Sequence, residues 1–282
     1  MNRVAVLNVV ALSPNLIGEH TPAIAALAER SGGVRTMTTT TPAVTTTVQT
    51  SMLTGATVSE HGIVANGWYD RTEGQVKFWK QSNRLVEAEP VWKTARQRDP
   101  GFTCANICWW YAMNSDVDVY VTPRPIYRAN GRKVPDCLTR PGELRDQLQA
   151  KHGTFPLFKF WGPGASIEST RWIVDAALDV EQASKPTLEL VYLPHLDYGL
   201  QKLGPDHPEI PRHLREVDAE VARLLERFDR EGVKVILVSE YGIEPVRRGV
   251  ALNRMLRQEG LLALREELGR EMLVPDECRA FA

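Results

Sequence analysis

The stretch VKVILVS (residues 233–239) decides the fold of this 282-residue chain, because it is apolar almost throughout instead of alternating between apolar and polar residues. The runs VAVLNVV (4–10) and TLELVYL (187–193) have the same character. A strand with one face in water alternates, whereas a strand covered on both faces is continuously apolar. We therefore expect these runs to be buried strands of a parallel sheet with helices on both faces.

Segments with helical spacing alternate with these strands. One of them, residues 211–231, has apolar residues three or four positions apart, which is typical of a helix lying on a core. These apolar residues are Leu214, Val217, Val221, Leu224, Leu225 and Phe228. Strand–helix–strand alternation predicts an α/β fold, a three-layer sandwich around a mostly parallel central sheet. Further helices are expected at 21–30, 168–183 and 251–260, and further strands at 102–108, 116–122 and 261–266.

Composition and charge narrow the class of protein. Lys and Arg number 34 and Asp and Glu 35, a net charge of −1, which disfavours binding to nucleic acid or to an anionic membrane. No apolar run approaches the roughly 18–20 residues of a membrane helix. The four cysteines are too few to cross-link the chain, and we expect buried thiols in a cytoplasmic protein. We expect one domain, residues 1–282, with a proline-rich insertion at about 123–164.

Polar residues follow the predicted strands where an open parallel sheet binds its ligands, beyond the carboxyl ends of the strands. Asp197 follows one such strand, and Glu240 and Tyr241 follow another. Thr45 stands before a predicted helix at about 46–54, where a hydroxyl faces free backbone N–H groups that suit a phosphate. These residues are the candidates for a functional site.

Each of these residues has a structural interpretation as well. Thr45 fits an N-cap, Asp197 fits a turn cap ahead of Gly199, and a carboxylate after a strand fits a solvated group. His195, two residues before Asp197, would share a face with it on a strand and serve as a ligand or base, or it would only pack. The aromatic run at residues 109–111 fits a substrate pocket and the core equally well.

The segment TTTTPAVTTTVQTSMLTGATVSEHGIVAN (38–66) resembles the nucleophile region of the type I phosphodiesterase/nucleotide pyrophosphatase family, within the alkaline phosphatase superfamily. Three elements carry the resemblance with their spacing kept: Pro42 to Thr45, Thr54-Gly55, and His61-Gly62-Ile63 to Asn66. The resemblance implies that Thr45 is a nucleophile that becomes transiently phosphorylated. It also implies that Asn66 donates a hydrogen bond to a non-bridging phosphate oxygen, and that His61 belongs to the turn scaffold.

The likeness continues more weakly along the chain, and there the family's metal ligands are partly replaced. Asp197 is kept, Gln201 stands where the family has a His, and Glu240 and Tyr241 stand where it has an Asp and a His. Val10-Ala11 replaces an Asp-Gly pair, a late His has no counterpart, and the chain looks C-terminally short. The resemblance implies that Asp197, Gln201, Glu240 and Tyr241 bind a divalent metal. The metal would be zinc, or a single weakly bound Mg²⁺ or Mn²⁺ ion because few ligands remain.

These observations predict a phosphoric ester or diester hydrolase, of phosphodiesterase or nucleotide pyrophosphatase type, that acts through Thr45 with metal assistance. The expected partner is a small-molecule phosphate ester or nucleotide-like substrate, with no nucleic acid and no membrane, and the oligomeric state stays open. One alternative is a catalytically silent relative that serves as an anion-binding or scaffolding module. Another is a different transferase or hydrolase that uses the same nucleophile with one metal ion or none.

Overall fold

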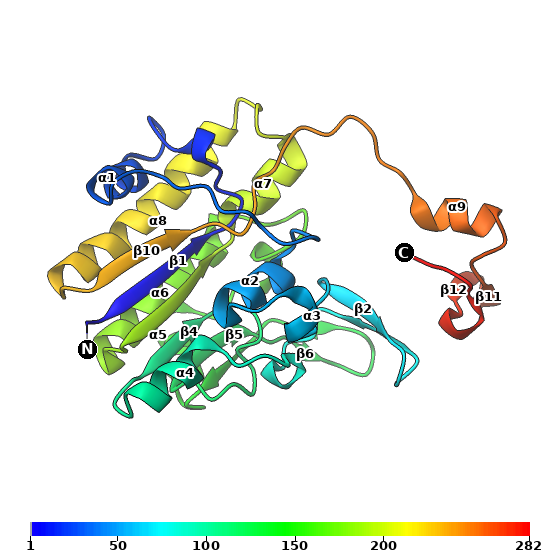
Figure 1. Cartoon of the computed structure of the whole chain (residues 1–282), viewed down its shortest axis with the longest axis horizontal. Helices are drawn as coiled ribbons and strands as arrows, with labels where there is room; N and C mark the ends of the chain where they lie inside the picture. The colour runs from blue at the N-terminus through cyan, green and yellow to red at the C-terminus, as the bar shows by residue number, and fades with distance from the viewer. Residues whose placement is uncertain (1) are drawn as a thin grey trace. The chain divides into compact units, whose positions relative to one another are not determined.

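The computed structural model describes residues 2–282, and its main feature is a central sheet (Figure 1). In spatial order the strands of this sheet are β10 (Lys234–Val238), β1 (Val4–Val9), β9 (Leu188–Leu193), β4 (Cys104–Ile107), β5 (Val119–Pro123) and β8 (Cys137–Arg140). Neighbouring strands pair in parallel except at one edge, where β8 runs antiparallel to β5. The mostly parallel sheet predicted from the apolar runs is therefore confirmed. The expectation that the run at 233–239 is a buried strand is wrong, because β10 lies at the edge of the sheet and none of its residues is buried.

Helices cover both faces of this sheet. On one face, α6 (Ile167–Ser184) packs on β9 and β4, and α8 (Ile210–Arg230) packs on α6 and β10. On the other face lies α2 (Thr45–Thr54) (Figure 1). The three-layer α/β sandwich is thus confirmed, and all the apolar positions predicted for the helix at 211–231 are buried. The remaining helices around the sheet are α1 (Pro22–Arg30), α3 (Val58–His61), α4 (Val91–Arg98), α5 (Leu144–His152) and α7 (His195–Leu203).

The proline-rich stretch at 123–164 is more regular than its composition suggests. It contains β8 and α5, together with the short pair β6 (Ile126–Tyr127) and β7 (Lys133–Val134). Because β8 pairs with β5, part of this stretch extends the central sheet instead of standing apart from it.

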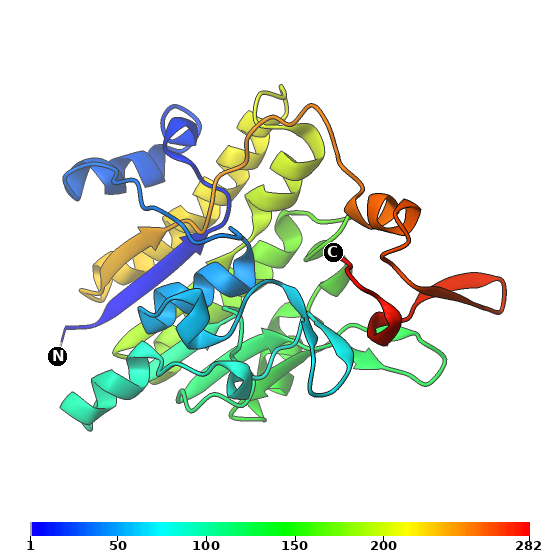
Figure 2. The same ribbon diagram turned by 45° about the vertical axis from the view of Figure 1, so that its right-hand side comes forward.

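The chain divides into two compact units. The larger comprises residues up to 66 and residues 81–244, and it carries the central sheet and every candidate site residue. The smaller comprises residues 67–80 and 245–282 (Figure 2). The predicted strand at 261–266 belongs to a separate hairpin of this smaller unit, not to the central sheet. The elements of the smaller unit are β2 (Gly67–Asp70), β3 (Gln75–Phe78), α9 (Leu252–Gln258), β11 (Leu264–Glu267) and β12 (Arg270–Leu273).

Short 3-10 helices lie at Pro14–Leu16, Asn83–Leu85, Leu157–Lys159 and Pro275–Glu277. Across residues 2–282, no helix combines the length and the apolar character that crossing a membrane requires.

Candidate functional site

Thr45 begins the element around which the candidate site is built. It is the first residue of α2, and Val44 occupies the N-cap position, so the interpretation of Thr45 as an N-cap is wrong. The Thr45 residue is 6% exposed and lies in the first helical turn, where backbone N–H groups have no partner within the helix and the helix dipole is positive. An anion in contact with the Thr45 hydroxyl would therefore meet a favourable potential.

A hydrogen-bonded chain connects Thr45 to Asp197 through Tyr241. Thr45 Oγ1 lies 3.4 Å from Tyr241 Oη, although the two residues are 196 positions apart in sequence. The Tyr241 hydroxyl donates to Asp197 Oδ1 at 3.1 Å, and Gln201 Nε2 donates to Asp197 Oδ2 at 2.9 Å. Because the tyrosine proton points to the carboxylate, its oxygen is the acceptor for the threonine proton. Asp197 lies inside α7, not at a turn before Gly199.

Glu240 lies at the end of the same sheet and is 1% exposed, so it is not a solvated carboxylate. Its Oε1 accepts from Asn8 Nδ2 at 2.7 Å and from Gln49 Nε2 at 2.5 Å. Its Oε2 is buried and has no hydrogen-bond partner within the part of the chain that the structure describes. Burial raises the pKa of Glu240 to about 7, with opposing effects from Gln49, Asn8 and the nearby Thr45 hydroxyl.

Asn8 and Gln49 are site residues that sequence reasoning missed. Asn8 is fully buried near the end of β1, and a polar residue inside an otherwise apolar strand was the signal that could have identified it. Gln49 is buried in α2, one helical turn after Thr45, and its Oε1 accepts from the backbone N–H of Trp110 at 2.6 Å. Together they hold the Glu240 side chain in one place.

Asn66 is held beside the first turn of α2. Its Oδ1 accepts from the backbone N–H of Thr46 at 3.1 Å, and Thr46 Oγ1 donates to the carbonyl of Ala65 at 2.8 Å. The oxygen of Asn66 is thereby used, and its amide nitrogen is the atom left to donate. His61 is the last residue of α3, where its ring contacts Ser51 Oγ at 2.9 Å and its Nδ1 accepts from the backbone N–H of Ile63.

The residues at this site do not fit a pair of zinc ions. Such a pair needs about six to eight Asp and His ligands, but Val10 is a fully buried apolar residue, and Gln201 and Tyr241 are neutral. Among residues 2–282, three or more His, Cys, Asp or Glu ligands gather at a different place. A single hard ion fits, because Glu240 Oε2 is an orphaned carboxylate oxygen and Mg²⁺ and Mn²⁺ prefer oxygen ligands.

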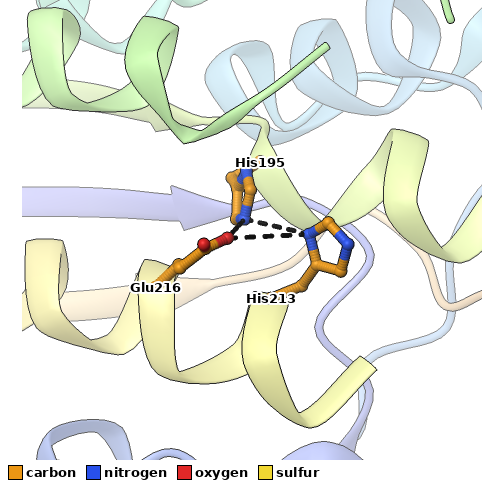
Figure 3. A group of neighbouring side chains, drawn as sticks. All are labelled: His195, His213 and Glu216. Carbon is orange, nitrogen blue, oxygen red and sulfur yellow. Dashed lines mark hydrogen bonds and ion pairs between the residues drawn. The ribbon is translucent and has the colours of Figure 1, made fainter. Parts of the chain in front are cut away.

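His195 and Asp197 both lie on α7, not on a strand, so the expectation that they share a face is wrong. The His195 side chain points instead to His213 and Glu216 on α8 (Figure 3). Burial, with the neighbouring His213, lowers the pKa of His195 to about 4. The aromatic residues 109–111 are each no more than 5% exposed, which favours packing over a pocket wall.

Comparisons with known proteins place this geometry in context. The family model described as type I phosphodiesterase / nucleotide pyrophosphatase matches residues 4–282. An uncharacterised pyrophosphatase/phosphodiesterase of Schizosaccharomyces pombe is 25% identical over 235 residues, which are 80% of this chain and 41% of that protein. The chain therefore spans less than half the length of this relative.

Solved structures share the fold. Murine ectonucleotide pyrophosphatase/phosphodiesterase 5, as an inactive variant in complex with AMP, has a TM-score of 0.63 and 18% identity, with 97% of this chain and 66% of that chain covered. Phosphonoacetate hydrolase from Sinorhizobium meliloti, in complex with phosphonoformate, has a TM-score of 0.62 and 15% identity, with 94% and 64% covered. Since the family model extends from the first strand to residue 282 and the fold agrees, the chain belongs to the type I phosphodiesterase/nucleotide pyrophosphatase family of the alkaline phosphatase superfamily.

Proposed function

We propose that this chain hydrolyses phosphoric esters or diesters, of phosphodiesterase or nucleotide pyrophosphatase type, with Thr45 as the nucleophile. The observation that carries the proposal is the chain of contacts from Thr45 Oγ1 through Tyr241 to Asp197 at the start of α2. A threonine hydroxyl is a weak nucleophile unless a neighbouring group accepts its proton. Tyr241 and Asp197 supply that acceptor, and the helix terminus supplies the anion site.

In the first step, Thr45 Oγ1 forms a bond to phosphorus and the bond from phosphorus to the leaving oxygen breaks. The leaving oxygen departs as an anion and takes a proton from solvent. The threonine proton passes to Tyr241, whose own proton passes to Asp197. Burial raises the pKa of Asp197, against the hydrogen bonds from Gln201 and Tyr241, which makes it a stronger base than an exposed aspartate. In the second step, water attacks phosphorus and the bond to Thr45 breaks. One proton of the water stays on the phosphate and the other passes to solvent, while the proton held by Asp197 returns through Tyr241 to Thr45.

Two other groups stabilise the charge on the phosphate. Asn66 donates from its amide nitrogen to a non-bridging oxygen, and backbone N–H groups of the first turn of α2 donate as well, apart from that of Thr46, which donates to Asn66 Oδ1. Glu240, through its unpartnered Oε2, would hold one hard divalent ion next to Thr45. Such an ion, when bound, neutralises phosphate charge and lowers the pKa of the threonine hydroxyl.

The substrate class follows from the site and from the relatives. A helix terminus with an asparagine donor suits one phosphoryl or phosphonyl group, and the similar solved structures hold AMP and phosphonoformate. We infer a small-molecule phosphate ester or nucleotide-like substrate for this chain as well.

Thr45→Ala and His195→Ala, assayed side by side on an aryl phosphodiester, test the proposal. Thr45→Ala should lose several orders of magnitude in rate, because it removes the atom that is phosphorylated, whereas His195→Ala should lose far less. The assay covers a range of Mg²⁺, Mn²⁺ and Zn²⁺ concentrations, and acid-quenched samples are examined by mass spectrometry for phosphate on Thr45. A wild-type rate in Thr45→Ala would refute the mechanism.

A catalytically silent relative is the second candidate, and the misfit of the zinc pair favours it. A wild-type chain that binds AMP or inorganic phosphate but shows no hydrolysis with any of the three metals would establish this alternative. Binding that falls on Thr45→Ala and Asn66→Ala would then place the anion at the start of α2.

A further inference from the structure

A second cluster of polar side chains lies where α7 and α8 face each other (Figure 3). His195 begins α7, and His213 and Glu216 lie one turn apart on α8. His195 Nε2 is 2.9 Å from Glu216 Oε2 and 3.2 Å from His213 Nδ1, and His213 Nδ1 is 3.8 Å from Glu216 Oε2. Their side chains are 2%, 14% and 24% exposed, so the cluster is buried on the α7 side and reachable from α8.

No placement of the protons on the two histidine rings satisfies every hydrogen bond of this cluster. In the first arrangement, His195 Nε2 carries a proton that points to Glu216, and His213 Nδ1 carries none and accepts. The proton of His213 is then on Nε2, which lies 3.3 Å from a nitrogen of the Arg212 guanidinium, so two donors face each other. If His213 carries its proton on Nδ1 instead, it opposes the His195 proton. If His195 is protonated on Nδ1, its Nε2 lone pair faces the Glu216 carboxylate. A cation bound by all three atoms also leaves the His213 proton on Nε2 facing Arg212, so it is the spacing of the three atoms that favours a metal site.

The spacing of the three atoms matches a metal site. The circle that passes through them has a radius of about 2 Å, and zinc binds histidine nitrogen and carboxylate oxygen at about 2.0–2.2 Å. An ion slightly out of their plane would therefore bond all three and keep a fourth tetrahedral position open on the exposed side. Two imidazoles with one carboxylate form a donor set typical of zinc and similar transition metals.

The surroundings hold the ligands in this arrangement. Arg212 Nη1 donates to Glu216 Oε1 at 2.8 Å, which turns Oε2 toward the two histidines. A Cβ atom at Gly199 would lie 3.3 Å from three atoms of the His213 ring, so glycine at this position leaves room for the ring against α7. Outer-shell contacts of this kind orient metal ligands.

We propose that His195, His213 and Glu216 form a binding site for one zinc or similar divalent transition-metal ion, separate from the site around Thr45. None of the three belongs to the hydrogen-bonded set of Thr45, Tyr241 and Asp197. The ion joins the start of α7 to α8. Because Asp197 lies in the same first turn of α7 as His195, the bound ion fixes the helix that positions Asp197.

Equilibrium dialysis of the chelator-treated full chain against Zn²⁺, with metal counted by elemental analysis, tests the site without an activity assay. We expect one zinc ion per wild-type chain. In His213→Ala and Glu216→Gln, we expect affinity to fall by more than the roughly 10–100-fold that loss of an outer-shell contact costs. His207→Ala is the matched control, since His207 precedes α8 but lies outside the cluster, and it should bind like wild type.

The double variant Asp197→Asn, Glu240→Gln separates this site from the proposed catalytic one. Zinc retained by the double variant and lost from His213→Ala supports the inference, whatever the hydrolysis assay shows. Zinc lost from the double variant but retained by His213→Ala overturns it, as does a wild-type chain that binds none. Thermal melting of each apo variant shows that it is folded, and a rise in melting temperature on adding Zn²⁺ should occur in wild type and be absent from His213→Ala.

Discussion

Replacing Glu189 by glutamine should stabilise this protein, and more strongly as the pH rises. Glu189 lies in β9, is 2% exposed, and neither of its carboxylate oxygens has a hydrogen-bond partner within residues 2–282. Burial, with the neighbouring carboxylate of Glu181, raises its pKa well above the ordinary 4.5, and Arg3 opposes the shift only in part. The folded protein therefore keeps a proton on Glu189 that the unfolded chain releases.

The size of the effect follows from proton linkage. Between pH 4.5 and the higher pKa of the folded state, the native protein binds more protons than the unfolded chain, so stability is highest at low pH and falls as the pH rises. The loss is about 1.4 kcal/mol per pH unit. Glutamine has the same shape and cannot ionise, so it removes this loss.

Urea unfolding at pH 5, 6, 7 and 8, followed by tryptophan fluorescence, measures the difference between wild type and Glu189→Gln. We expect it to grow by about 1.4 kcal/mol for each pH unit above the ordinary pKa of 4.5, until the higher pKa of the folded state is reached. Glu226→Gln is the control, because the Glu226 side chain is 74% exposed and its replacement should change stability little at any pH. A difference for Glu189→Gln that is constant from pH 5 to pH 8 would refute the reasoning.

Tyr241→Phe should lower the rate of hydrolysis by about 10²–10⁴-fold, because it removes the hydroxyl that passes a proton to Asp197. Steady-state kinetics measure this rate, and thermal melting should show an unchanged melting temperature. Asp218→Ala should cost about 0.5–2 kcal/mol in urea unfolding, since its carboxylate accepts two backbone N–H groups at the start of α1. Burial by itself raises the pKa of Asp136, but the hydrogen bonds from Arg145 and other donors have the larger combined effect and bring this pKa below its ordinary value of 3.8. Its stabilising contribution is present above pH 3.8 and lost as the pH falls through the native pKa, so Asp136→Asn should cost about 1–3 kcal/mol in calorimetry at pH 7 and little near the acid limit.

Local patterns determined the central elements of the fold. The apolar runs at 4–10 and 187–193 became β1 and β9, because a strand covered on both faces needs apolar side chains on both. The run at 233–239 became β10, an edge strand without a buried residue, so its place in the sheet was decided by the fold. The helix at 211–231 followed from the spacing of its apolar residues, three or four positions apart, because that spacing places them on the one face that packs against the core. The family was also readable from residues 38–66, where the motif spacing lies within one short segment.

Only the tertiary structure decided how distant residues meet. Hydrophobic periodicity does not encode which strands are neighbours, so the contacts of Glu240 with Asn8 and Gln49, which are 232 and 191 positions away, had no local signal. The pairing of β8 with β5 and the placement of His195 beside α8 are of the same kind. The sequence by itself determined most of the elements and the apolar face of α8, because hydrophobic spacing is local. The site around Thr45 and the histidine cluster required the fold, because their geometry depends on side chains from segments that only packing brings together.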